Sequence, residues 1–341
     1  MFIEELANYR CPVSMREMKI VDSKHNDIGE VVSGRIQCAD FEYLIEAGIP
    51  DFTYPKELPE ADFNSRVSYN SVSEDYDNVQ NVTFKILEVD ENEIRSNMID
   101  FLQLELGHRV LETAAGTGLN FPFIVRALNG KGELYAQDIS NGMLQKAKAQ
   151  YHSKKYQSEM FFSYSICNAA YLPFPDNYFD AAFSFGGIGV FSDQKRAICE
   201  MCRVVKPQGR VVFGDEGVAP WLRAAEYGKI LIDNNKFYQN EVPLDLLPVD
   251  ARDLCVRWIM GGGFYLVDFT VGEGEPVANF DYPIPGQRGG TLRTRYYGKL
   301  EGVSPETQGL VRDAAKKCKL SMHDWLDAVL KDAANITLKG K

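Results

Sequence analysis

The chain has 341 residues, of which 45% are hydrophobic and 25% charged. This length predicts about two domains, and so ordinary a composition excludes a fibrous repeat and disorder along the whole chain. No apolar run approaches the roughly 18 residues that cross a bilayer, and the first residues lack the basic flank of a leader peptide. We therefore expect a globular protein that does not span a membrane.

The charge and the cysteines narrow the range of partners and compartments. The 37 basic side chains are outnumbered by 48 acidic ones, which gives a formal net charge of −11. A field of this sign repels phosphate backbones and argues against nucleic acid as a partner. Seven scattered cysteines do not form the disulfide framework of a small secreted domain. A cytoplasmic localisation is the simplest reading, and the sequence leaves a homo-oligomer open.

Residues 1–60 are predicted to form a small β-rich module. Turn-forming residues surround two strand-like stretches, 30–36 and 41–45. Residues 56–80 are polar and have no hydrophobic pattern. Such a stretch is typical of a linker, or of a segment that becomes ordered over a ligand.

Beyond this linker the pattern changes to alternating strands and helices. Asp90 and Glu93 form a capping pair for a helix over residues 91–104. Five apolar strand candidates follow, at residues 108–113, 133–137, 160–166, 179–185 and 209–214. Helical patterns separate them, at about 119–129, 141–152 and 192–205. The alternation predicts an α/β fold with a doubly wound, Rossmann-like and mostly parallel sheet of seven strands, covered by helices on both faces.

The predicted sheet domain, residues 61–303, contains an aromatic insertion at 219–258. We expect this insertion to wall a substrate pocket through Trp221 and Tyr227. The last two strand candidates follow the insertion, at residues 264–271 and 291–297.

The tail, residues 304–341, has two amphipathic helical patterns, and Ser321 with Asp324 caps the second. Packing against the rest of the chain is favoured over a partner surface.

The strongest functional signal is a glycine turn between a strand and a helix. Residues 109–120 read RVLETAAGTGLN, an apolar strand with an acid near its end, followed by small residues. Gly116 and Gly118 allow the backbone to approach a ligand closely, and the following helix N-terminus offers unpaired N–H groups. A small ligand is therefore expected to lie across this turn.

A second acid, Asp138, follows the next strand, 20 residues after Gly118. This spacing suits a carboxylate that accepts hydrogen bonds from both hydroxyls of an adenosine ribose. Folds that bind nicotinamide dinucleotides share the arrangement, but their pattern ends in a third glycine under the pyrophosphate. The stretch from Ala114 to Asn120 lacks this final glycine, which argues against a nicotinamide cofactor.

Together these stretches resemble the class I S-adenosylmethionine-dependent methyltransferases, and most closely the group that contains the ubiquinone and menaquinone methyltransferases. The resemblance rests on residues 112–118, Asp138, residues 168–180 (NAAYLPFPDNYFD) and residues 200–213 (EMCRVVKPQGRVVF). Four motifs in the family's order over residues 108–214 make it specific. It implies S-adenosyl-L-methionine as cofactor and S-adenosyl-L-homocysteine as product.

The resemblance also implies roles for individual residues. Glu112 would contact the amino group of the methionine moiety, Gly116, Thr117 and Gly118 would line the methionine and ribose, and Asp138 would hold the ribose. The same turn would contribute Ala114 and Asn120. The adenine would be contacted by Ile139 and Met143, and its edge by Asn168 and Ala169. Ser184, Phe185 and Gly186 would lie beneath the sulfonium.

Two residues depart from the family pattern. Ala114 stands where the family often has glycine, which is tolerable if its φ is negative. Asn168 stands where an aspartate commonly accepts from the adenine amino group, although an amide oxygen can also accept.

The front module resembles the small zinc-ribbon-like domain found beside some methyltransferases. Cys11 and Cys38 match that pattern, but the metal-bearing form has a second cysteine three positions after each, and these positions hold Ser14 and Phe41. Two cysteines do not complete a tetrahedral zinc site. We therefore predict a module without metal; His25 would be a third ligand in the less favoured alternative.

Methyl transfer from a sulfonium is an in-line displacement, so alignment of the acceptor and exclusion of water are the main tasks of the protein. A general base is needed only where the acceptor must lose a proton. The sequence offers Tyr76, His152, Asp215 and Glu216 as weak candidates. The last two follow a strand at the edge where open α/β sheets bind ligands.

Three functions remain open at this stage. The favoured one is methylation of a small, apolar or aromatic metabolite. The second is methylation of RNA or protein, with residues 1–60 presenting the macromolecule. The third is a noncatalytic or repurposed protein that binds S-adenosylmethionine.

Overall fold

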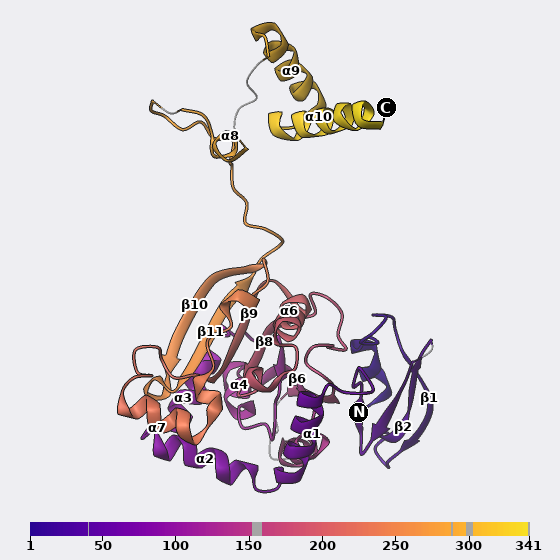
Figure 1. Ribbon diagram of the computed structural model, residues 1–341. Helices are drawn as coiled ribbons and strands as arrows, with labels where there is room; N and C mark the ends of the chain where they lie inside the picture. Colours follow the sequence, from indigo (N-terminus) through magenta and orange to yellow (C-terminus); the bar gives the residue numbers. More distant parts are fainter. Residues whose placement is uncertain (40, 152–158, 288, 298–302, 340–341) are drawn as a thin grey trace. The chain divides into compact units, whose positions relative to one another are not determined.

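The computed structural model describes residues 1–39, 41–151, 159–287, 289–297 and 303–339. The chain divides into two compact units, Met1–Pro276 and Val277–Lys341, and we describe each by itself (Figure 1). In the described part of the chain, no helix is long and apolar enough to cross a membrane.

The first unit is built on one sheet of eleven described strands, in the order β1-β2-β3-β4-β7-β6-β5-β8-β9-β11-β10. The strands are β1 (Lys19–His25), β2 (Val31–Cys38), β3 (Phe41–Glu46), β4 (Ile49–Asp51), β5 (Arg109–Thr113), β6 (Lys131–Asp138), β7 (Glu159–Ile166), β8 (Phe179–Phe185), β9 (Val205–Glu216), β10 (Ala251–Ile259) and β11 (Phe264–Val271). The neighbours β4-β7, β7-β6, β6-β5, β5-β8 and β8-β9 pair in parallel. The neighbours β1-β2, β2-β3, β3-β4, β9-β11 and β11-β10 pair antiparallel.

The mixed α/β fold is confirmed. The sheet has eleven described strands where seven were predicted, because four strands of the front module join the seven strands β5 to β11. The front module joins the same sheet, because Asp51 of β4 pairs with Ile166 of β7. The strand predicted at 291–297 is wrong. Leu292–Tyr297 forms the short helix α8, and the antiparallel edge strand is β10, at the end of the predicted insertion.

Helices cover both faces of the sheet. They are α1 (Glu60–Val72), α2 (Tyr76–Ile86), α3 (Glu91–Asp100), α4 (Phe121–Ala127), α5 (Asn141–Tyr151), α6 (Gln194–Val204) and α7 (Glu226–Asn234), with the 3-10 helices η1 (Ile3–Asn8), η2 (Ile188–Val190), η3 (Lys236–Gln239), η4 (Leu244–Leu246) and η5 (Met260–Gly262). Because side chains alternate along a strand, Val110 of β5 packs with α3, α4 and α5, whereas its neighbour Leu111 packs with α6 and the front module. The region 56–80, predicted to be unpatterned, contains all of α1 and the start of α2.

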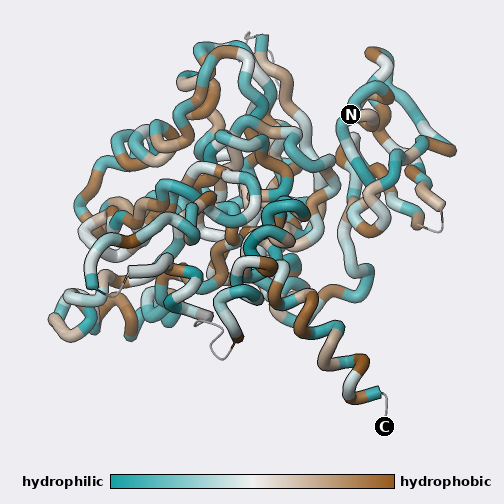
Figure 2. Tube along the Cα trace, turned by 90° about the horizontal axis from the view of Figure 1, so that it is seen from above, coloured by the Kyte–Doolittle hydropathy of each residue, from teal (hydrophilic) through white to brown (hydrophobic). Residues whose placement is uncertain are grey.

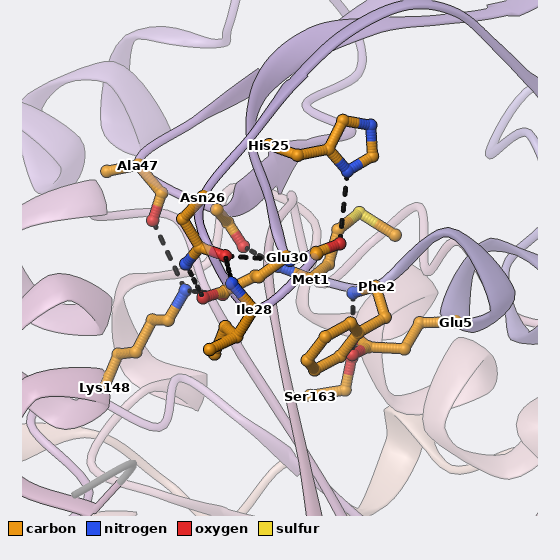
Figure 3. Close-up of polar contacts among 12 residues, drawn as sticks. Met1, Phe2, Glu5, His25, Asn26, Ile28, Glu30, Ala47, Lys148 and Ser163 are labelled. Carbon is orange, nitrogen blue, oxygen red and sulfur yellow. Dashed lines mark hydrogen bonds and ion pairs between the residues drawn. The ribbon is translucent and has the colours of Figure 1, made fainter.

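An ion cluster fastens the front module to α5 (Figure 3). The Glu30 carboxylate accepts from Lys148 Nζ at 2.5 Å and from the Met1 amino group at 3.0 Å. Lys148 also donates to the Ala47 carbonyl. Burial raises the pKa of Glu30, but these hydrogen bonds and positive charges outweigh it and hold the pKa at about 2.

The second unit contains α8 and the helical tail. Helices α9 (Pro305–Cys318) and α10 (Met322–Lys339) confirm the two predicted patterns. Ser321 Oγ accepts from the Asp324 N–H, as expected of the cap. Hydrophobic and hydrophilic stretches alternate along the helix that ends at the C-terminus (Figure 2).

The Glu30–Lys148 pair provides a test of how the module is held. We expect Lys148→Met to lower the free energy of unfolding by about 1–3 kcal/mol, because it leaves a buried carboxylate short of a donor. Lys131→Met is the matched control, since the Lys131–Glu159 pair is exposed and such pairs contribute about 0–1 kcal/mol. Urea denaturation measures both.

The depressed pKa of Glu30 sets the pH range of this effect. The stability gained from its ionised form is present above pH ~4.5 and is lost as the pH falls toward 2. The deficit of Lys148→Met relative to the wild type should therefore shrink across that range. Equal stability of the two proteins at neutral pH would contradict this account.

Candidate functional site

A cavity lies at the carboxyl ends of β5, β6, β7 and β8, next to α1 and α2. Many of the predicted site residues line it: Tyr76, Ala114, Gly116, Asp138, Ile139, Met143, Asn168, Ala169, Phe185 and Gly186. Asp62, Tyr69 and Gln137 also line it, and the sequence analysis missed them. The cavity therefore combines the predicted strand ends with α1 and the start of α2, from the segment expected to be a linker or to become ordered over a ligand.

The glycine turn has a left-handed backbone at three positions. The φ angles are +51° at Ala114, +56° at Gly116 and +82° at Gly118. A Cβ on Gly118 would lie 2.6 Å from the Phe121 ring, so only glycine fits there. The expectation of a negative φ at Ala114 is wrong. Its methyl group fits because a glycine, Gly187, lies opposite: a Cβ there would be 2.5 Å from that of Ala114.

Asp138 holds this turn in place. One carboxylate oxygen accepts from the Gly116 N–H and the other from the Ser140 N–H, both at 2.8 Å. The side chain is buried, and burial raises its pKa to about 6, although hydrogen bonds from backbone N–H groups oppose the shift. Asp138 thus combines a structural role in the turn with a position on the cavity wall.

Glu112 lies behind the turn as a buried acid with an unused oxygen. Its Oε1 accepts from Asn120 Nδ2 at 2.8 Å, and Arg95 Nη1 donates to Asn120 Oδ1 at 2.6 Å. Its Oε2 is buried and has no hydrogen-bond partner. Burial raises the pKa of Glu112 to about 8, against the opposing effects of Asn120 and Arg95. Arg95 lies on α3 and is a member of this network that sequence reasoning missed.

Helix α1 contributes a buried carboxylate, Asp62, to the cavity wall. Asp62 Oδ1 accepts from the Ser192 N–H at 2.9 Å. Its Oδ2 accepts from Ser192 Oγ at 2.6 Å and from Asn168 Nδ2 at 2.8 Å. Asp62 therefore ties α1 to the end of β7 and to the loop that precedes α6.

Helix α2 is fixed to the glycine turn and to α5. Asp77 accepts from Thr117 Oγ1 at 2.5 Å and pairs with Lys146 Nζ at 3.3 Å. The Thr117 hydroxyl thus faces α2. Tyr69 and Tyr76 line the cavity, and burial raises the pKa of both phenols.

The two acids at the end of β9 form a buried pair. The Asp215 carboxylate accepts from the Gly189 N–H at 2.6 Å and from the Glu216 N–H at 2.8 Å. Burial and the adjacent Asp215 raise the pKa of Glu216 to about 9, so this side chain is protonated near neutral pH. Neither acid lines the cavity, but both act electrostatically on Tyr69, which does.

The remaining candidates lie elsewhere. Ser184 is fully buried, and its hydroxyl has no partner. The expectation that Trp221 and Tyr227 wall the pocket is wrong for the cavity described here: Trp221 is 67% exposed and packs edge-on against Trp258. The walls come instead from α1 and α2. His152 lies outside the described residues.

The two cysteines of the front module contact side chains of that module. Cys11 Sγ lies 3.3 Å from the Tyr43 hydroxyl, and Cys38 Sγ lies 3.5 Å from Ser14 Oγ. Among the residues that the structure describes, no group of three or more His, Cys, Asp or Glu side chains is arranged to hold a metal ion. The likeness to a zinc ribbon stays a prediction.

Comparison with known proteins defines the class of the central region. Residues 111–213 match the family model described as a methyltransferase domain. Over 107 residues the chain is 36% identical to the ubiquinone/menaquinone biosynthesis C-methyltransferase UbiE of Francisella philomiragia. This alignment covers 31% of this chain and 42% of that protein. The corresponding enzyme of Yersinia enterocolitica is 35% identical over 114 residues, and this alignment covers 33% of this chain and 45% of that protein.

A solved structure of Haemonchus contortus phosphoethanolamine N-methyltransferase 2 with S-adenosyl-L-methionine is 15% identical and covers 67% of this chain and 63% of that one, with a TM-score of 0.47. The chain spans less than half the length of the curated relatives described above. Their matches nonetheless support the resemblance to the S-adenosylmethionine-dependent methyltransferases, and residues 111–213 are similar to a methyltransferase domain.

The raised pKa of Glu112 predicts that this acid destabilises the free protein. The folded chain holds its proton up to pH ~8, whereas the ordinary value is 4.5. Stability should therefore fall as the pH rises between these values. We expect Glu112→Gln to raise the melting temperature at about pH 8 and to change it little near pH 5.

Differential scanning calorimetry without ligand checks this expectation. Glu105→Gln, at a side chain that is 82% exposed, is the control and should leave the melting temperature unchanged at both pH values. A lower melting temperature for Glu112→Gln than for the wild type at the higher pH would show that the Glu112 carboxylate is stabilising instead.

Proposed function

We propose that the protein is an S-adenosylmethionine-dependent methyltransferase whose donor binds in the cavity between the glycine turn and helices α1 and α2. The observation that carries this proposal is the arrangement of the turn at Gly116 with two buried acids, Glu112 and Asp138, at the ends of neighbouring strands. The match of residues 111–213 to a methyltransferase domain supports it independently.

The polar groups around the turn suit the donor. Glu112 Oε2 and Gln137 Oε1 are buried acceptors without partners, and such atoms favour a ligand that brings hydrogen-bond donors or positive charge. An ammonium or sulfonium group supplies charge, and the ribose supplies hydroxyl donors for Asp138. Ile139 and Met143 provide apolar contacts beside Asp138.

The donor supplies a methyl group on a sulfonium, which is already a good leaving group. The tasks left to the protein are to orient the two reactants and to exclude water. Helices α1 and α2 serve the second task, because Asp62 and Asp77 fasten them to the strand ends.

We propose a small, apolar or aromatic acceptor. Phe185, Val190 and Phe191 give the cavity an apolar wall, and the net charge of −11 disfavours a polyanion. The names of the relatives, which are C-methyltransferases of quinone biosynthesis, agree with such an acceptor. If the acceptor must lose a proton, Tyr76 is the predicted candidate within the described residues that lines the cavity.

Two alternatives are kept open by the same features. Residues 1–60 could present RNA or protein to the cavity, and the site could bind the donor without transferring its methyl group. Incubation of the full chain with methyl-labelled S-adenosylmethionine and a cell extract, separated into metabolites and macromolecules, distinguishes the three. Label in the metabolite fraction supports the proposal, label in RNA or protein contradicts the choice of acceptor, and no label despite donor binding favours the noncatalytic alternative.

Asp138 provides a direct test of the donor site. We expect Asp138→Asn to weaken binding of S-adenosylhomocysteine by about 1–3 kcal/mol, because charged hydrogen bonds to the ribose are lost. Since the pKa of Asp138 is raised to about 6, wild-type affinity should increase as the pH rises through this value and the carboxylate ionises, whereas the variant should show no such step.

Isothermal titration calorimetry between about pH 5 and 8 measures both effects. Asp193→Asn is a suitable control, because this exposed N-cap of α6 lies outside the cavity and asparagine caps equally well. Unchanged affinity in Asp138→Asn would place the ribose elsewhere.

A further inference from the structure

One part of the cavity wall pairs a carboxylate with an amide. Asp62 is 3% exposed and Asn168 is 4% exposed, and both line the cavity. Asn168 is fixed in orientation, because its Oδ1 accepts from the Ala170 N–H at 2.9 Å and its Nδ2 donates to Asp62 at 2.8 Å. The orientation of the amide therefore follows from its partners, and its oxygen is already in use.

Asp62 and Asn168 each keep hydrogen-bonding capacity that a ligand can use. A carboxylate offers about four acceptor sites, and Asp62 uses two at Oδ2, for Ser192 Oγ and Asn168, and one at Oδ1, for the Ser192 N–H. One acceptor site remains at Oδ1. The Asn168 amide has a second N–H besides the one that it donates to Asp62. The edge thus presents an acceptor next to a donor.

This pattern is complementary to a 6-aminopurine. The Watson–Crick edge of adenine carries an amino donor next to the N1 acceptor, whereas a 6-oxopurine presents an acceptor next to an N–H donor. We propose that Asp62 reads the adenine amino group of the donor and that helix α1 thereby sets the base specificity of the site. This inference rests on the proposed function, because it requires the adenosine to lie in this cavity.

The positions of the other lining residues agree with adenine recognition by Asp62. The ribose is assigned to Asp138, and the apolar side chains of Ile139 and Met143 continue the wall beside it. The base then lies between these apolar contacts and the Asp62–Asn168 edge. A carboxylate aligned on an amino group, in a site that excludes water, discriminates strongly against a ligand that brings an oxygen there instead, because two acceptors then face each other.

The test compares two ligands that differ only at this edge: S-adenosyl-L-homocysteine and its deaminated analogue, S-inosyl-L-homocysteine. Calorimetry on the full wild-type chain should show that the adenosyl ligand binds about 10- to 100-fold more tightly, as for one well-made base contact. In Asp62→Asn this ratio should fall toward one, because an amide can turn either a donor or an acceptor to the base.

Asp77→Asn is the matched control. Asp77 also fastens a covering helix, through Thr117 and Lys146, but it does not line the cavity. This variant should weaken both ligands by a similar factor and leave their ratio unchanged. An equal fall of the ratio in both variants would show that closure of the helices, and not base recognition, sets the preference.

A double variant covers the case in which Asp62→Asn does not fold, which circular dichroism detects. Asp62→Asn combined with Asn168→Asp restores a carboxylate–amide pair and moves the acceptor to the end of β7. It should recover a preference for the adenosyl ligand of at least tenfold, whereas Asn168→Asp alone places two carboxylates together and should bind both ligands weakly.

The outcomes separate this inference from the proposed function. Binding of both ligands by the wild type with equal affinity, or a ratio that is unaltered in Asp62→Asn, would overturn the role of Asp62 while the donor site stands. Absence of binding by either ligand to the wild type would overturn the proposed function and this inference with it.

Discussion

Burial of carboxylates at the strand ends is the constraint on which the site depends. Glu112 and Asp138 lie on the neighbouring strands β5 and β6 and are almost fully buried, where an ionised carboxylate is costly. The surrounding fold offsets part of this cost: backbone N–H groups donate to Asp138, and Arg95 acts on Glu112 through Asn120. The part that is not offset raises the pKa of Glu112 to about 8 and that of Asp138 to about 6, and Glu112 Oε2 stays without a hydrogen-bond partner.

The same constraint explains which parts could be predicted from the sequence. The strand at 109–113, the turn at Gly116 and the acid at 138 are adjacent in sequence and enforced locally, by hydrophobic pattern and by positive φ, so they could be read directly. Arg95 could not, because a charged residue on a helix is ordinarily exposed. Only the tertiary fold shows that it faces Asn120, 25 positions away.

The errors in the fold prediction arise from contacts between segments that are distant in sequence. The front module looked separate because its strands are short and turn-rich, yet Asp51 pairs with Ile166 and Glu30 reaches Lys148 on α5. Residues 56–80 looked unpatterned because α1 buries a polar side chain, Asp62, where an amphipathic helix would bury an apolar one. A hydrophobic pattern cannot reveal a helix that packs through hydrogen bonds.

This kind of packing bears on how α1 is held. A helix held by apolar burial gains from contact with any nonpolar surface, and α2 has such a contact, because Phe84 is buried in an apolar cluster with Val218 and Phe264. Helix α1 is held at the cavity by directional bonds at Asp62 and at Asn70, which accepts from Ser140 Oγ and the Gly142 N–H. Water can replace such bonds at modest net cost, about 0.5–1.5 kcal/mol each, so these contacts of α1 stabilise the fold less than the apolar core of the sheet does.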